Sequence, residues 1–395
     1  MIRIPHLRSL LAGAALVSLA GPAFALDGAD LVNKLNATYA TSGLSIGYSN
    51  IDVDGETVTL EGAELKAGAQ TPAKIGTVTM EGVEEDGKGG YTIETVSFEN
   101  IDMTKDGATV KASDLALAGV TVPASVTGGT LDSLLMYETA STGPISVTKD
   151  GKELFSMSGM EANMTRMDAD AGLEFDATFS DLKADMTRVE DPKAKDTLQK
   201  LGITSLDGEI AMSGSWTLAD GKIAVDEYAF DFKDIGRLNL ALEISGYTLD
   251  FIKGMQEALK AAEANPNKEE ANAAMGMSIM GLVQQLSFNS ASISFADASI
   301  TKRLLDFAGA EQGVSGDQMA QSLKGLVPIM IAQLNMPELQ NQVSAAVNAY
   351  LDDPKNIKVS AVPGNPVPFP MIMGAAMGAP NTLPQVLGVT VSANE

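Results

Sequence analysis

The chain has 395 residues, with 27 basic and 51 acidic side chains, a net charge of −24, one histidine and no cysteine. This acidity is expected to repel nucleic acid phosphates and anionic lipid head groups, and the missing cysteine excludes a disulfide scaffold. A hydrophobic core must therefore provide the stability, and 45% apolar residues in a chain of this length are enough for one.

The first 25 residues, "MIRIPHLRSLLAGAALVSLAGPAFA", predict a cleaved signal peptide. Arg3 and Arg8 form a basic lead, residues 10–20 are apolar, and residues 23–25 have the small-x-small cleavage pattern. The apolar run is short for a membrane span, so an uncleaved anchor is the alternative. Cleavage would remove two arginines, the only histidine (His6) and no acid, which changes the net charge from −24 to −26. We expect an exported, periplasmic protein without a transmembrane span in its mature chain.

A mature chain without histidine and cysteine excludes Ser-His-Asp and Cys-His catalysis, and imidazole or thiolate metal sites. Carboxylate chemistry stays open, as in glycosidases or oxygen-ligated Ca²⁺ and Mg²⁺ sites. Asp168, Asp170 and Glu174 in "MDADAGLEF" have part of a Ca²⁺-loop spacing, and the alternative is a solvated turn. No Gly-rich phosphate loop or basic-aromatic patch is present, so we predict no cofactor and no nucleic acid partner.

Along the chain, a short helix is predicted over residues 30–39, where apolar residues recur every four positions. Apolar and polar residues then alternate, which is typical of strands with one buried and one wet face. Asp-Gly pairs at 54–55, 106–107, 150–151 and 220–221 predict two-residue hairpin turns.

One phrase recurs in these strands: two apolar residues in alternation, then Gly, Asn or Asp, then another apolar residue. It occurs at 58–63, 78–83, 96–101, 115–120 and 155–160, with looser copies at 177–182, 230–235 and 293–298. Gly, Asn and Asp accept the left-handed conformation of a bulge. Each phrase therefore predicts a strand that ends in a bulge.

The longest copy spans residues 206–232, where apolar residues share one face of two strands and the register switches at Asp226-Glu227. Another strand follows at 238–244. Helical patterns then cover 248–264, 269–286, 301–309, 315–333 and 337–351, with strands at 291–295, 357–361 and 386–393. The prediction divides the mature chain into residues 26–247, mostly antiparallel β with a short N-terminal helix, and residues 248–395, helix-rich with a few returning strands.

The predicted fold class is α+β: a large curled antiparallel sheet, a bulged hairpin meander, packed against C-terminal helices. Sheets of ten or more strands rarely stay flat, and repeated bulges increase their curl. The expected product is a gutter with an apolar inner wall. Either the helices of residues 248–351 fill it, or part of it stays open to an acyl chain.

In the open case, nine side chains are the candidate ligand contacts, and the methionine-rich helix at 275–286 is an adaptable lid over the sheet. These residues are Leu206, Ile210, Met212, Trp216, Phe230 and Phe232 on the strands, and Met275, Ile279 and Leu282 on the helix. The alternative for Trp216 is a core position. The alternative for the methionines, which also cluster at 371–379, is ordinary core packing.

The repeated phrases with Asp-Gly turns, in an exported chain, resemble the β-rich repeats of AsmA-type envelope proteins. Residues 201–246, "LGITSLDGEIAMSGSWTLADGKIAVDEYAFDFKDIGRLNLALEISG", are similar to the YdgA-type exported proteins of unknown function, and the resemblance covers residues 40–300. It implies a curled periplasmic sheet, and AsmA-type proteins are associated with moving or organising phospholipids. This chain departs from them in its cleavable signal and in being too short to bridge two membranes. The resemblance therefore implies a soluble chaperone or accessory subunit, and it supplies no functional residue.

Three classes of function follow. The first is a non-enzymatic periplasmic protein with an apolar groove, which binds a lipid or another hydrophobic ligand in envelope maintenance. The second is a structural or interaction module whose exposed sheet edges pair with another envelope protein, which needs a long uncharged edge strand. The third is a carboxylate-dependent hydrolase, which needs two converging acids, one with a raised pKa.

Overall fold

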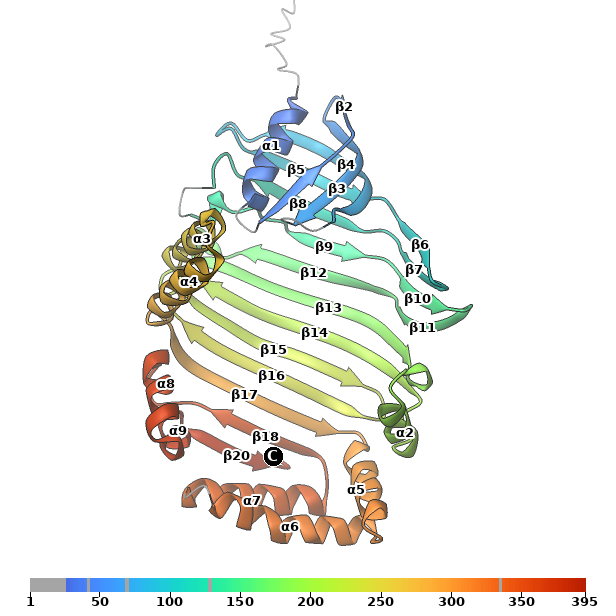
Figure 1. Ribbon diagram of the computed structural model, residues 1–395, viewed down its shortest axis with the longest axis vertical. Helices are drawn as coiled ribbons and strands as arrows, with labels where there is room; N and C mark the ends of the chain where they lie inside the picture. The colour runs from blue at the N-terminus through green and yellow to red at the C-terminus, as the bar shows by residue number, and fades with distance from the viewer. Residues whose placement is uncertain (1–25, 41–42, 68–70, 127–129, 334–335) are drawn as a thin grey trace, which may run out of the picture.

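The computed structural model describes residues 26–40, 43–67, 71–126, 130–333 and 336–395, and the predicted signal peptide lies outside them. Within these ranges the protein is α+β, as predicted, with one large antiparallel sheet and helices gathered toward the C-terminus (Figure 1).

The N-terminal strands curl around the first helix, α1 (Gly28–Tyr39), whose N-terminus is capped by the Asp27 side chain. Leu31, Val32 and Leu35 of α1 pack against the inner side chains of the surrounding strands, and this core holds the most completely buried large side chains of the described chain. The strands are β1 (Leu44–Gly47), β2 (Asn50–Asp54), β3 (Thr57–Ala67), β4 (Ala73–Glu85), β5 (Tyr91–Phe98) and β8 (Ala116–Val122).

The next strands are split by kinks, and their outer halves form an arm that bends away from the main sheet (Figure 1). At one kink the Asn100 side chain accepts a hydrogen bond from the Asp114 backbone (3.1 Å), and Asp114 has a positive φ of 54°. The arm consists of β6 (Ile101–Lys105), β7 (Ala108–Ala112), β10 (Ile145–Lys149) and β11 (Lys152–Met157), beside β9 (Thr139–Thr142) and β12 (Gly159–Arg166).

From β12 onward, each strand pairs with the next one along the chain, from β12 through β18, and β20 completes the sheet. The single sheet therefore crosses the predicted division at residue 248. These strands are β13 (Gly172–Asp185), β14 (Ser205–Thr217), β15 (Lys222–Phe232), β16 (Gly236–Ser245), β17 (Ser287–Asp297), β18 (Asn356–Ala361) and β20 (Val389–Ala393), with the short β19 (Val367–Pro368) beside β17.

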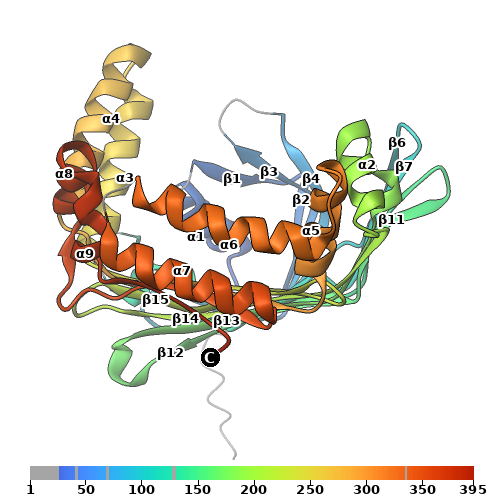
Figure 2. The same ribbon diagram turned by 90° about the horizontal axis from the view of Figure 1, so that it is seen from below.

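The helices stand along the margins of this sheet, and Figure 2 shows that they rise from one side of it. They are α2 (Pro192–Lys200), α3 (Leu249–Ala264), α4 (Lys268–Val283), α5 (Ile300–Glu311), α6 (Gly316–Ala332), α7 (Pro337–Asp352), α8 (Phe369–Gly378) and α9 (Leu383–Val386). The helices predicted between residues 248 and 351 are confirmed within a few residues. The helix α2 was not predicted.

Five of the eight copies of the repeated phrase have a positive φ at the predicted position, namely Gly62, Gly82, Gly119, Asp181 and Asp234. The prediction is wrong at Asn100, Gly159 and Asp297, whose φ is not positive. At Gly62 and Asp181 (φ 59° and 52°) the register shifts, which makes a bulge. At Gly82 and Gly119 (φ 64° and 61°) one pair is skipped and the register is kept. The prediction that the phrase ends the strand is wrong at these four sites, because pairing resumes on both sides of the single left-handed residue.

Replacing Gly119 by alanine is expected to lower the free energy of unfolding by about 1–2 kcal/mol, because a left-handed backbone costs that much for a residue with a Cβ. The new Cβ would also lie 2.5 Å from Glu138 Cγ. Urea unfolding measures the change. The control is Gly325→Ala on α6, where the site is open and alanine favours the helix, so stability should rise by up to about 1 kcal/mol. A neutral Gly119→Ala would contradict the expectation.

The Asp-Gly prediction holds for two of its four sites. At 106–107 and 150–151 both residues have positive φ and close two-residue turns. At 54–55 the loop is shifted by one residue, because Asp54 still pairs with Thr57. At 220–221 the loop spans four residues, since the Asp220 carboxylate accepts hydrogen bonds from the Thr217 hydroxyl and the Lys222 backbone (2.8 and 3.1 Å).

Candidate functional site

One face of the sheet is apolar from β12 to β20. Residues directly opposite one another on paired strands point to the same side of a sheet. A first row of opposed residues consists of Met160, Phe179, Ile210, Phe230, Leu238, Phe295 and Ile357. A second row, beside it, consists of Ala162, Ala177, Met212, Tyr228, Leu240, Ile293, Val359 and Val391. We call this surface the apolar face.

Bulges keep this face apolar where the alternation of the sequence slips. Val225 lies opposite Leu242 and Tyr228 lies opposite Leu240, so both belong to the apolar face although three positions separate them. The register shift falls on the charged pair Asp226-Glu227, as predicted. The bulge therefore keeps the two carboxylates, Asp226 and Glu227, off the apolar face.

The middle of the apolar face is open to solvent. Ile293 is 54% exposed, and Leu242 and Val359 are each 42% exposed. Their neighbours Leu240 and Phe295 are only half-buried. The helices therefore do not fill the gutter. Of the two alternatives from the sequence, the structure has the one in which part of the gutter stays open.

The opposite face of the same strands is polar. Arg237 pairs there with Glu227 and with Asp231 (Nη1–Oδ2 3.0 Å). On β17, the residues between the apolar positions include Ser292 and Ser294. Exposure to solvent is therefore normal for the polar face. It is unusual for the apolar face, since monomeric proteins rarely expose large contiguous apolar patches.

The structure brings the predicted strand residues together. Leu206, Ile210 and Met212 on β14 and Phe230 and Phe232 on β15 share the apolar face, where Ile210 lies directly opposite Phe230, and all five are half-buried.

Trp216 lies on the same strand as Ile210, but it is 8% exposed. Its indole N–H donates to the Tyr247 carbonyl (2.8 Å), and the ring packs among Leu173, Leu249 and Ile252. Trp216 is therefore a core residue that anchors α3 to the sheet, which was the alternative interpretation.

The three predicted helix residues do not form a lid. Leu282 is buried against α3, where its side chain occupies the space beside Gly254. Met275 and Ile279 lie on the same helix α4, which stands beside α3 at the margin of the sheet rather than over it (Figure 2). The methionines Met277 and Met280 are largely exposed.

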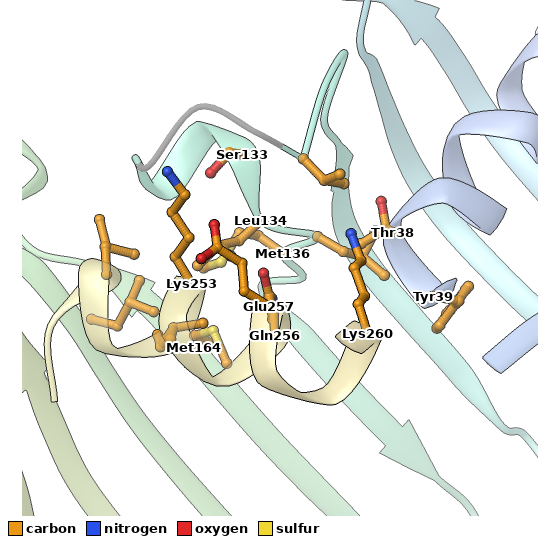
Figure 3. Close-up of a pocket in the computed structure, with 15 residues that line it drawn as sticks. Thr38, Tyr39, Ser133, Leu134, Met136, Met164, Lys253, Gln256, Glu257 and Lys260 are labelled. Atoms are coloured by element: carbon orange, nitrogen blue, oxygen red, sulfur yellow. The ribbon is translucent and has the colours of Figure 1, made fainter. Parts of the chain in front are cut away.

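A cavity that the sequence did not predict lies where the apolar face meets the N-terminal strands (Figure 3). Its volume is about 590 Å³, within the usual range for ligand sites. Met164 and Leu173, which belong to β12 and β13, form part of its lining, so the cavity adjoins the apolar face. The other lining residues are Val126 and residues from the end of α1, from 133–136 and from α3. We call it the end cavity.

The mouth of the end cavity is polar. Lys253, Gln256, Glu257 and Lys260 of α3 line it (Figure 3). Below them, Leu134, Met136, Met164 and Ile252 are apolar. The end cavity thus joins an apolar floor to a charged rim.

A second, almost wholly apolar cavity of about 400 Å³ lies inside the curled N-terminal strands. Tyr39, Leu135 and Met136 line both cavities and so form the partition between them. Burial raises the pKa of the Tyr39 phenol, which keeps this group neutral in the partition.

Asp132 ties the N-terminal strands to β12 at the edge of the end cavity. Its carboxylate accepts hydrogen bonds from Arg166 (Nη1, 2.9 Å) and from Lys88 (Nζ, 3.2 Å). These bonds lower the pKa of Asp132, with that from Arg166 as the largest cause.

Replacing Asp132 by asparagine is expected to cost at most about 1 kcal/mol at pH 7, because these ion pairs are exposed. The lowered pKa means that the stabilisation is present above the unfolded-state pKa, about 3.9, and is lost as the pH falls through the folded-state pKa. Urea unfolding of both proteins at pH 7 and below pH 3 measures this. The difference should vanish in acid, and an equal difference at both pH values would contradict the ion-pair account.

The predicted acidic cluster is not assembled as a cation site. Asp170 lies 3.4 Å from Arg166, and within the described ranges no group of three or more acidic, histidine or cysteine side chains is placed to hold a metal ion, Asp168 and Glu174 included. Among the residues that the structure describes, the carboxyl groups whose pKa is shifted have it lowered by hydrogen-bond donors; these are Asp30, Asp132, Asp185, Glu190 and Asp220. A hydrolytic general acid needs the opposite shift.

The last strand of the sheet is covered on its outer edge. The Val391 backbone N–H donates to the Gln342 side chain of α7 (3.2 Å), and the Asn394 side chain donates to the Ala349 carbonyl (2.8 Å). At the other end, β2 carries Asp52 and Asp54. Covered or charged edges disfavour strand addition by another protein.

In the part of the chain that the structure describes, no helix combines the length and apolarity that a membrane crossing needs. A family profile described as "Uncharacterized protein" matches residues 229–394, which run from within β15 to β20. The match covers less than half of the chain and includes α3 and the most exposed part of the apolar face. No curated protein matches the chain.

Proposed function

We propose that the protein binds the acyl chains of lipids, or similar hydrophobic ligands, on its apolar face, as a non-enzymatic protein of the bacterial envelope. The observation that carries the proposal is the exposure of Ile293 and Val359 in the second apolar row and of Leu242 beside it. Contact between such an apolar surface and water is unfavourable, so an apolar ligand that covers the surface lowers the free energy.

The size of the face supports the proposal. From β12 to β18 the first row spans six strand spacings, about 29 Å at roughly 4.8 Å each. One leaflet of a bilayer has a hydrocarbon thickness of about 15 Å, half of the ~30 Å core, so a whole acyl chain fits along the row. Each methylene removed from water contributes about 0.8 kcal/mol, and a long chain therefore binds without any strong polar contact.

The proposed location is the periplasm. Residues 1–25 have the basic lead, apolar run and cleavage pattern of a signal peptide. A protein that carries lipid through an aqueous compartment needs an apolar surface for the tail and a polar surface toward water, and the polar face with its Arg237 ion pairs provides the second.

The test is organic extraction of the protein, purified from its native compartment without detergent, followed by mass spectrometry of the extract. We expect stoichiometric phospholipid or fatty acid. A clean extract, repeated after incubation of the protein with labelled liposomes, would overturn the proposal.

A further inference from the structure

We infer that the end cavity is the head-group site for the proposed ligand, and that it selects amphiphiles with one anionic head group over uncharged ones. This inference rests on the proposed function, because it assumes that the tail lies on the apolar face. It adds the place, the polarity and the charge of the other end of the ligand.

The position of the end cavity fits a head-group site. Its floor includes Met164 of β12, and Met164 lies directly opposite Phe175, whose strand carries the apolar face onward. A tail on the apolar face thus reaches the cavity without crossing a polar residue. The rim is formed by α3, whose Lys253, Glu257 and Lys260 side chains line the cavity (Figure 3) and are exposed.

The rim is positively charged in a strongly acidic protein. Lys253 and Lys260 lie on α3 two turns apart, about 10.5 Å along the helix axis. Within the described part of the chain, no carboxylate lies within 4 Å of either ammonium group, whereas Lys88, Lys149 and many other lysines are paired. Unpaired lysines at the mouth of an apolar cavity are the expected partners of an anionic head group.

Glu257 lies between the two lysines on the same helix and lines the same cavity. The three side chains together carry a charge of +1, so the site favours an anionic head group over an uncharged one. At about 0.1 M salt the Debye length is about 10 Å, which screens the distant acids of the chain. Asp250 of the same helix lies closer, but it does not line the cavity.

The experiment uses Trp216, the only tryptophan of the chain. Trp216 packs against Leu249 and Ile252, which also line the end cavity, so a brominated tail beside them should quench its fluorescence. The probes are 9,10-dibromostearate and the corresponding uncharged alcohol at pH 8 and 0.1 M salt. A lysophosphatidate with the same chain separates a phospholipid-type head from a fatty acid.

We expect the acid to bind about fivefold more tightly than the alcohol, since two exposed ion pairs supply this much. The double variant Lys253→Gln/Lys260→Gln should remove the preference, and Glu257→Gln should increase it. The control Lys193→Gln/Lys233→Gln changes the net charge equally at exposed lysines outside the cavity and should keep the preference.

Equal affinity for acid and alcohol in the unmodified protein, or a preference that survives the double variant, would overturn the inference and leave the proposed function standing. Quenching by neither probe, together with a clean extract, would overturn both. The lysophosphatidate result assigns the source: tighter binding than dibromostearate indicates a phosphate head, and weaker binding indicates a carboxylate, with the anionic class supported in either case.

Discussion

The double variant Ile293→Glu/Leu242→Glu is expected to retain at least tenfold less lipid than the unmodified protein while it keeps its fold. Both side chains are already exposed, so the charges cost little in folding. In the complex, however, each carboxylate would be covered by a hydrocarbon chain, and burying an unpaired charge is far more costly than losing an apolar contact. Mass spectrometry of detergent-free preparations measures the retained lipid.

The matched control is Ser294→Glu/Ala241→Glu. These residues lie on the same two strands, on the polar face, and they add the same net charge. Lipid retention should equal that of the unmodified protein, and circular dichroism should show the same fold for both variants. If the two double variants lost lipid equally, overall charge and not the apolar face would be responsible.

Replacing Leu60 by alanine is expected to lower the free energy of unfolding by about 2–5 kcal/mol. Leu60 is almost completely buried in the N-terminal core, beneath α1, and a large-to-small change there leaves a cavity in addition to losing apolar burial. Urea unfolding, followed by circular dichroism, measures the loss.

The matched control is Leu326→Ala, the same chemical change at a half-exposed position of α6. Here little burial is lost and alanine favours the helix, so the change should stay within about 0.5 kcal/mol. Similar losses for the two variants would mean that the N-terminal core contributes no more than the surface.

Most of the fold was predictable because its signals are local. Period-two alternation and left-handed residues such as Gly62 and Gly119 act within a few positions of the chain, and so do helix caps. The missed helix α2 also had such a signal, because Asp191 caps it and Pro192 occupies its first turn. Its polar composition hid it from a search for apolar periodicity.

The candidate site was predictable only where one strand pair forms it. The contact between Ile210 and Phe230 follows from a single hairpin. The end cavity instead combines the end of α1, residues 133–136, two strands and α3, which are far apart in the chain. Likewise, the periodicity that places Leu282 on the apolar side of its helix does not say which neighbour buries it. In the structure, Leu282 packs beside Gly254 of α3 and not against the sheet.

The sequential pairing from β12 to β18 has a consequence for how such a protein varies in evolution. Each strand depends mainly on the strands before and after it in the chain, much as in a repeat protein. Duplicating one hairpin would widen the sheet by two strand spacings, about 9.6 Å, without disturbing the N-terminal core. The lysine rim would stay where it is. Relatives of different length could then accept longer or shorter tails while they recognise the same head.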